Sequence, residues 1–164
     1  MNSGQLFLTI GGMFLLSLLV IRMNTTIMAT GDVMYNTKYS VLAVSLGTSM
    51  IEEANSKSFD SNTDTNSVSS LNQITDPANL GPDSGETFAT YNDFDDFNNY
   101  ERVDSTMPSA VFKMQCKVGY VKDTNPDQFV SQKTWHKRIL VTVTSRSMQD
   151  TIRLSSIFSY WFFR

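Results

Sequence analysis

An uninterrupted apolar run near the amino terminus most constrains how this chain can fold. No residue from Met1 to Ile21 is charged, and the stretch from Leu6 to Ile21 is almost entirely apolar. The run is close to the lower limit for crossing a bilayer, which takes about 20 apolar residues. Such a surface has to be covered by lipid, by a partner or by other copies of the chain. We expect the covered residues to be Leu6, Phe7, Leu8, Ile10, Phe14, Leu15, Leu16, Leu18, Leu19, Val20 and Ile21.

A secretory signal peptide is the alternative interpretation of this run. Signal peptides begin with a basic region, whereas the first five residues contain no Lys or Arg. The best small-residue cleavage position, near Ala29, is weak. The sequence therefore favours a segment that remains in the working protein.

Composition excludes several classes of function. The net charge is −3, so no basic field over the whole chain indicates nucleic-acid binding. Cys116 is the single cysteine, which excludes an intramolecular disulfide, a cysteine-rich metal site and a covalently attached haem. Because Cys116 lies in an alternating pattern, we predict that it is a small buried apolar residue of a strand.

After Arg22 the pattern becomes that of an amphipathic helix, predicted over residues 31–58. The apolar positions Tyr35, Tyr39, Leu42, Leu46, Met50 and Ala54 recur every three or four residues and share one helical face. Gly31 and the pair Thr25–Thr26 predict a kink or an interruption. Taken together, residues 5–56 predict one long helix of about 75 Å, whose first half (residues 1–30) must project from the head formed by residues 31–164.

The remaining chain divides into a loop and a sheet. Residues 59–108 are rich in Ser, Thr, Asn, Asp, Gly and Pro and predict a variable acidic loop with short strands or a small helix. Residues 109–164 predict an antiparallel sheet of three to four strands. Two strands follow the alternation Phe112–Tyr120 and Ile139–Val143, a turn covers Thr124–Asp127, and a further strand covers Thr151–Phe163. The predicted fold class is α+β, with the long helix packed on the sheet.

This order of elements resembles the type IV pilins and pseudopilins. The stretches that carry the resemblance are Ala43–Ala54 followed by Phe59–Asp60, the acidic and aromatic Tyr91–Tyr100, and the strand Lys137–Ser145. The resemblance implies a pilin-like fold and assembly of identical subunits into a helical filament. It also implies an assembly machinery as partner and insertion into the membrane before assembly.

The amino terminus departs from the family pattern. The family's processing site has a basic leader, a Gly before Phe or Met, and a Glu at the fifth mature position. Here Gln5 follows Gly4, the fifth residue after Gly4 is Thr9, and the first acidic residue of the chain is Asp32. We therefore expect the assembled subunit to keep most or all of Met1–Gly4 and to be held by apolar contacts without an ion pair.

Candidate chemistry is sparse. Asp93, Asp95 and Asp96 gather hard oxygen ligands of the kind calcium prefers, so the sequence predicts either a calcium site or a solvated acidic loop. His136, the only histidine, is predicted on the strand surface beside Lys137 and Arg138, with no nucleophile motif around it. No other cofactor and no catalytic residue is predicted.

The sequence therefore predicts a structural protein and not an enzyme. It would be a subunit of an extracellular pilus-like filament of a bacterial cell envelope, with the apolar helices forming the filament core. The alternative is a single-pass membrane-anchored envelope protein, or a secretion-system pseudopilin that does not form long filaments.

Overall fold

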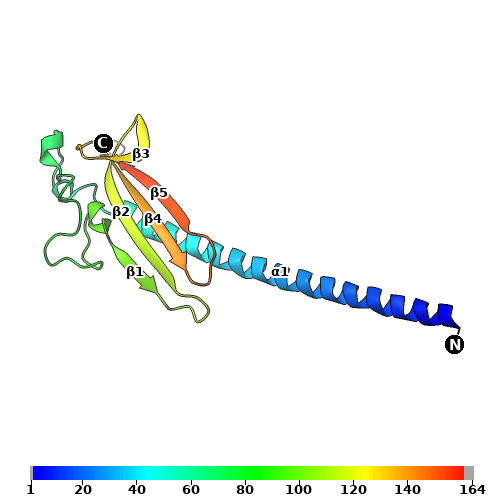
Figure 1. Cartoon of the computed structure of the whole chain (residues 1–164). Helices are drawn as coiled ribbons and strands as arrows, with labels where there is room; N and C mark the ends of the chain where they lie inside the picture. Colours follow the sequence, from blue (N-terminus) through cyan, green and yellow to red (C-terminus); the bar gives the residue numbers. More distant parts are fainter. Residues whose placement is uncertain (1, 161–164) are drawn as a thin grey trace. The chain divides into compact units, whose positions relative to one another are not determined.

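The computed structural model describes residues 2–160 and divides into two compact units, one up to Lys38 and one from Tyr39 onward. The predicted α+β class is confirmed (Figure 1). The elements, in chain order, are the helix α1 (Ser3–Asn55), the 3₁₀ turns η1 (Ser61–Thr63), η2 (Leu71–Gln73) and η3 (Asp95–Phe97), and the strands β1 (Glu101–Asp104), β2 (Phe112–Lys122), β3 (Asn125–Val130), β4 (His136–Ser145) and β5 (Ile152–Ser159).

Helix α1 runs without a break, so the predicted interruption near Gly31 is wrong. The threonines before Gly31 fit the helix because their hydroxyls donate to carbonyls one turn earlier. Thr25 and Thr26 both donate to the Arg22 carbonyl at 2.9 Å, and Thr30 donates to the Thr26 carbonyl at 2.9 Å. A helical glycine costs only about 1 kcal/mol relative to alanine, which a helix of 53 residues tolerates.

The buried face of α1 differs in part from the predicted face. Its buried residues are Tyr39, Ala43, Gly47, Met50 and Ala54. Tyr35 is instead 54% exposed, and Leu42 and Leu46 lie at the edge of the core. The face is centred on small residues because the helix backbone approaches the sheet closely at Gly47, where a Cβ would lie 3.4 Å from Val143 Cγ2.

The sheet is antiparallel and has five strands, one more than the predicted maximum. Strand β2 is central: β4 pairs along one of its edges, and β5 follows β4. Both β1 and β3 pair with the opposite edge of β2, β1 near Phe112–Gln115 and β3 near Tyr120–Lys122.

The two strands that were not placed individually from the sequence have weak sequence signals, although β1 lies in the loop predicted to contain short strands or a small helix. Strand β1 has only four residues, three of them exposed, and β3 begins with Asn125–Pro126 inside the predicted turn. The actual turn is Asp123–Thr124. The predicted last strand forms over β5, and its final residues, including Phe162, lie outside the described residues.

The core lies on one face of the sheet, against the second half of α1 (Figure 1). Opposed residues form rows across the three long strands. Cys116 pairs with Val141, which pairs with Leu154, and Val118 pairs with Ile139. The last row consists of Tyr120, Lys137 and Phe158, so the alternation that buries the apolar residues also places a lysine on the core face.

The acidic loop contains short helices, as predicted, and a group of aromatic rings that joins the core. The rings of Phe88, Tyr91, Phe97 and Tyr100 contact one another, with Phe88 stacked on Tyr100 at 4.9 Å between centroids. The loop is joined to the bare middle of the β2 edge, where the Cys116 amide donates to the Tyr100 carbonyl at 2.9 Å and the Val118 amide donates to Asn98 Oδ1 at 3.0 Å.

Candidate functional site

The first half of α1 presents an exposed apolar surface. All of the large apolar residues that the sequence predicted to be covered are exposed in the described structure, from 44% for Leu18 to 77% for Leu8. The two hydroxyls between Leu6 and Ile21 are satisfied within the helix, because Thr9 donates to the Leu6 carbonyl at 2.8 Å and Ser17 donates to the Met13 carbonyl at 3.0 Å. The surface therefore offers a partner apolar contact rather than polar recognition.

By its length and hydropathy, this helix could cross a membrane. The uncharged stretch from Asn2 to Ile21 spans about 30 Å in helical form, which is the thickness of a bilayer's hydrocarbon core. Gly11 and Gly12 have no atoms near the positions that a Cβ would take. They leave a part of the helix surface on which another helix could pack closely.

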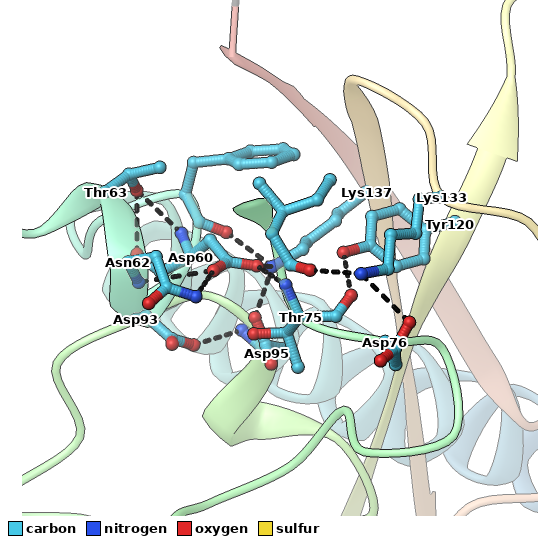
Figure 2. A network of polar contacts seen from close by, with 12 residues as sticks. Asp60, Asn62, Thr63, Thr75, Asp76, Asp93, Asp95, Tyr120, Lys133 and Lys137 are labelled. Atoms are coloured by element: carbon cyan, nitrogen blue, oxygen red, sulfur yellow. Dashed lines mark hydrogen bonds and ion pairs between the residues drawn. The ribbon is translucent and has the colours of Figure 1, made fainter. Parts of the chain in front are cut away.

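A second feature, a buried charged cluster, lies in the other unit at the end of the core (Figure 2). The side chain of Lys137 is fully buried, and its Nζ donates to three acceptors. These are the Phe59 carbonyl at 2.8 Å, Asp60 Oδ2 at 2.9 Å and Asp95 Oδ1. Nζ also lies 4.7 Å from the centroid of the Phe59 ring and 5.6 Å from that of Tyr120.

Asp60 is held as a carboxylate by several donors. Its Oδ2 accepts from the Thr75 amide at 2.9 Å, and its Oδ1 accepts from the amide and side chain of Asn62 at 3.2 and 3.3 Å. Burial alone would raise the pKa of Asp60, but the charge and hydrogen bond of Lys137, together with these amides, lower it below its ordinary value. Asp60 also caps η1, which fixes where the chain turns after α1.

The three candidate calcium ligands are buried, with exposed fractions of 2% for Asp93, 2% for Asp95 and 3% for Asp96. The alternative prediction, a solvated acidic loop, is therefore wrong for these residues. They are buried because each carboxylate has protein partners. Asp93 Oδ1 accepts from the amides of Asp95 and Asp96 at 2.8 and 3.2 Å, and Asp96 Oδ2 accepts from those of Asn92 and Asp93 at 2.9 and 3.0 Å.

The carboxylates of this loop also influence one another. Burial and the neighbouring charge of Asp95 raise the pKa of Asp93 to about 8. Burial likewise raises the pKa of Asp95, and Lys137 opposes this effect only in part. Within the described residues, no group of three or more His, Cys, Asp or Glu side chains is arranged to hold a metal ion. Calcium binding by Asp93, Asp95 and Asp96 stays a prediction.

The burial of Lys137 was not predicted, although the sequence contains a signal for it. Lys137 precedes Ile139, Val141 and Val143 by even numbers of residues and so belongs to the buried face of β4. His136, predicted at the surface, is half-buried, and its Nδ1 lies 2.7 Å from Ser159 Oγ. Cys116 is buried as predicted, and burial raises the pKa of its thiol to about 12.

No family model, characterised protein or solved structure matches this chain.

Proposed function

We propose that this chain is a structural subunit of a type IV pilus-like filament in a bacterial cell envelope. The exposed half of α1 would form the filament core with the same helices of other copies, and the unit from Tyr39 onward would form the outer shell. Before assembly, the apolar stretch would hold the subunit in the membrane, from which a pilus-type machinery would extract it. No catalytic role is assigned to any residue.

One observation carries this proposal. A single helix combines an uncharged apolar stretch with exposed side chains and a second half that packs on an antiparallel sheet. Burial of apolar surface contributes roughly 25 cal/mol per Å², so a stretch of this size would favour assembly strongly. The surface is continuous from Leu6 to Ile21 and carries no charge that would need a partner in a filament core.

A membrane anchor without polymerisation is the second candidate function. The observation that favours it is the match between the uncharged stretch and one bilayer thickness, with Arg22 directly after it. In this case the chain would be an envelope protein or a secretion-system pseudopilin. The two candidates differ in whether the wild-type protein leaves the membrane in fibres.

The test is to shear cells that produce the chain and to examine the released material by electron microscopy. We expect fibres from the wild type and from Leu16→Met, which keeps the apolar surface. We expect none from Leu16→Asp, because it would place an unpaired carboxylate in an apolar helix bundle. Unchanged thermal melting of the second unit in Leu16→Asp would show that the loss is one of assembly. Wild-type protein confined to membranes would favour the anchor.

A further inference from the structure

The buried cluster contains the reactants of an amide-forming reaction. A primary amine, Lys137 Nζ, is in contact with Asp95 Oδ1 and lies 2.9 Å from Asp60 Oδ2. The side chains of Lys137 and Asp60 are 0% exposed and that of Asp95 is 3% exposed. Figure 2 shows the two carboxylates converging on the same nitrogen.

The surroundings exclude water and favour a neutral product. The rings of Phe59 and Tyr120 lie against Nζ, and both are buried. An ammonium and a carboxylate lose their hydration when they are buried, and mutual attraction repays this cost only in part. Joining the two groups into an amide removes the ammonium and one carboxylate from the core and keeps one N–H donor. The remaining carboxylate, Asp60, still accepts from the backbone amides of Asn62 and Thr75.

We propose that Lys137 and Asp95 form an intramolecular isopeptide bond, with Asp60 transferring the protons. Lys137 Nζ first gives one proton to the Asp95 carboxylate, which produces an amine and a carboxylic acid. Nζ then attacks Cγ of Asp95, and Asp60 takes a second proton from Nζ. Asp60 returns this proton to the departing hydroxyl, the C–O bond breaks, and one water leaves. The ammonium and carboxylate are thereby converted to an amide and water, without an oxidant, a reductant or a cofactor.

Hydrogen bonding selects Asp95 over Asp60 as the carboxyl that reacts. Loss of either Asp60 oxygen would leave a backbone N–H without its acceptor, because Oδ1 accepts from the backbone N–H of Asn62 and Oδ2 from that of Thr75. The Asp95 oxygen that faces Lys137 accepts from Nζ, which takes its place in the product. The directions of the pKa shifts agree with this choice. Burial raises the pKa of Asp95 and so favours its acid form, whereas Lys137 and the backbone amides outweigh burial at Asp60, lower its pKa and favour the carboxylate.

The bond would tie the acidic loop to the sheet. Asp95 begins η3, and Lys137 lies near the start of β4, between Tyr120 and Phe158. The proposal does not depend on the filament function, because it concerns only the unit from Tyr39 onward.

Mass spectrometry of the purified full-length chain tests the proposal. We expect an intact mass lower by one water than that of the unmodified chain with the same termini. After trypsin digestion, we expect a branched peptide that joins Lys137 to Asp95, with no cleavage after Lys137. A free Lys137 in the folded wild type, cut by trypsin, would overturn the proposal. A branch at Asp60 would overturn the assignment of the reacting carboxyl.

Two variants separate the bond from other losses of water. Lys137→Arg keeps a positive charge at this position but offers no amine that can react in this way, so its chain should retain the water. Asp60→Asn keeps both reacting groups and removes the proton carrier, so most of its chains should remain unbranched at the time when the wild type is fully branched. A water loss in Lys137→Arg equal to that of the wild type would contradict the proposal.

Discussion

A Cβ atom on residue 47 would lie 2.8 Å from Cδ1 of Leu154, so α1 approaches β5 at a distance that suits glycine. We predict that Gly47→Leu destabilises the second unit by about 1–3 kcal/mol, because the larger side chain overpacks the core between helix and sheet. Chemical denaturation of the purified chain would measure this. The matched control is Thr48→Leu, which adds the same side chain at an exposed helical position and should change the stability by about 0.5 kcal/mol or less. Equal effects of the two changes would contradict the close approach.

Removal of the buried amine should be far more damaging than removal of a surface amine. Lys137→Met leaves Asp60 and Asp95 buried without the nitrogen that both contact. Breaking a buried pair typically costs about 3–5 kcal/mol, and in chains that carry the proposed amide the change also removes the cross-link. Lys57→Met breaks the pair with Glu53, whose side chain is 44% exposed, and such a pair contributes about 0.5 kcal/mol. Urea denaturation of both variants is the measurement. A loss below about 1 kcal/mol for Lys137→Met would show that the cluster contributes little to stability.

The raised pKa of Asp93 predicts that stability falls as the pH rises. The pKa of this carboxyl is about 8 in the folded chain and near 4 in the unfolded chain. Between about pH 4 and pH 8 the folded chain therefore binds more protons than the unfolded chain. The contribution of Asp93 is therefore full below about pH 4 and is lost as the pH rises through 8. Asp93→Asn should remove this dependence, because an amide does not ionise in this pH range. The hydrogen bonds are kept, since the amide oxygen can still accept from the backbone amides of Asp95 and Asp96.

Thermal melting between pH 5 and pH 9 tests this prediction. At pH 9, Asp93→Asn should be more stable than the wild type by at least about 1.4 kcal/mol, which corresponds to one pKa unit. The control is Asp123→Asn, which changes an exposed carboxylate in the β2–β3 turn and should leave the pH dependence as it is. Parallel melting profiles of Asp93→Asn and the wild type would contradict a raised pKa.

The small residues of the apolar stretch distinguish a filament from an anchor. Gly12→Leu makes the helix more apolar and replaces a poor helix former, so a simple anchor should tolerate it. A filament that packs helices closely at Gly12 should instead lose most of its fibres. Fibre yield and membrane content would be measured side by side, with Met13→Leu as the control that keeps the size of an existing side chain. Full fibre yield from Gly12→Leu would exclude close packing at this residue.

The elements that the sequence predicted well are those set by local patterns. Alternation in β2 and β4 identified the buried face of the sheet, because successive strand residues point to opposite sides. The run from Leu6 to Ile21 identified the exposed apolar helix, because its composition alone requires a cover. The burial of Cys116 was predicted from the same alternation. None of these predictions needed knowledge of distant segments.

The features that were missed depend on contacts between distant segments. A lysine is almost never fully buried unless it is paired, and the partners of Lys137 lie in the loop after α1 and in η3. The burial of Asp93, Asp95 and Asp96, predicted either as calcium ligands or as part of a solvated loop, was missed for the same reason. The buried face of α1 was misplaced because a search for large apolar residues gives no weight to Gly47, whose importance comes from the sheet opposite.

Asp60 and Asp95 contact the same nitrogen, Lys137 Nζ, and the Ser58 backbone pairs with Asn92 and Phe94 through hydrogen bonds of 3.1 and 2.9 Å. The two ends of the loop between them are therefore held at one place, and Val68, Ile74 and Leu80 within it are buried in the core. Each doubling of the length of such a closed loop costs only about 0.6 kcal/mol. Over evolutionary time the exposed part of this segment, residues 82–85, could gain, lose or exchange residues while the sheet and helix stayed as they are. Proteins with this fold could thus vary an exposed surface while one lysine holds the two ends of the loop together.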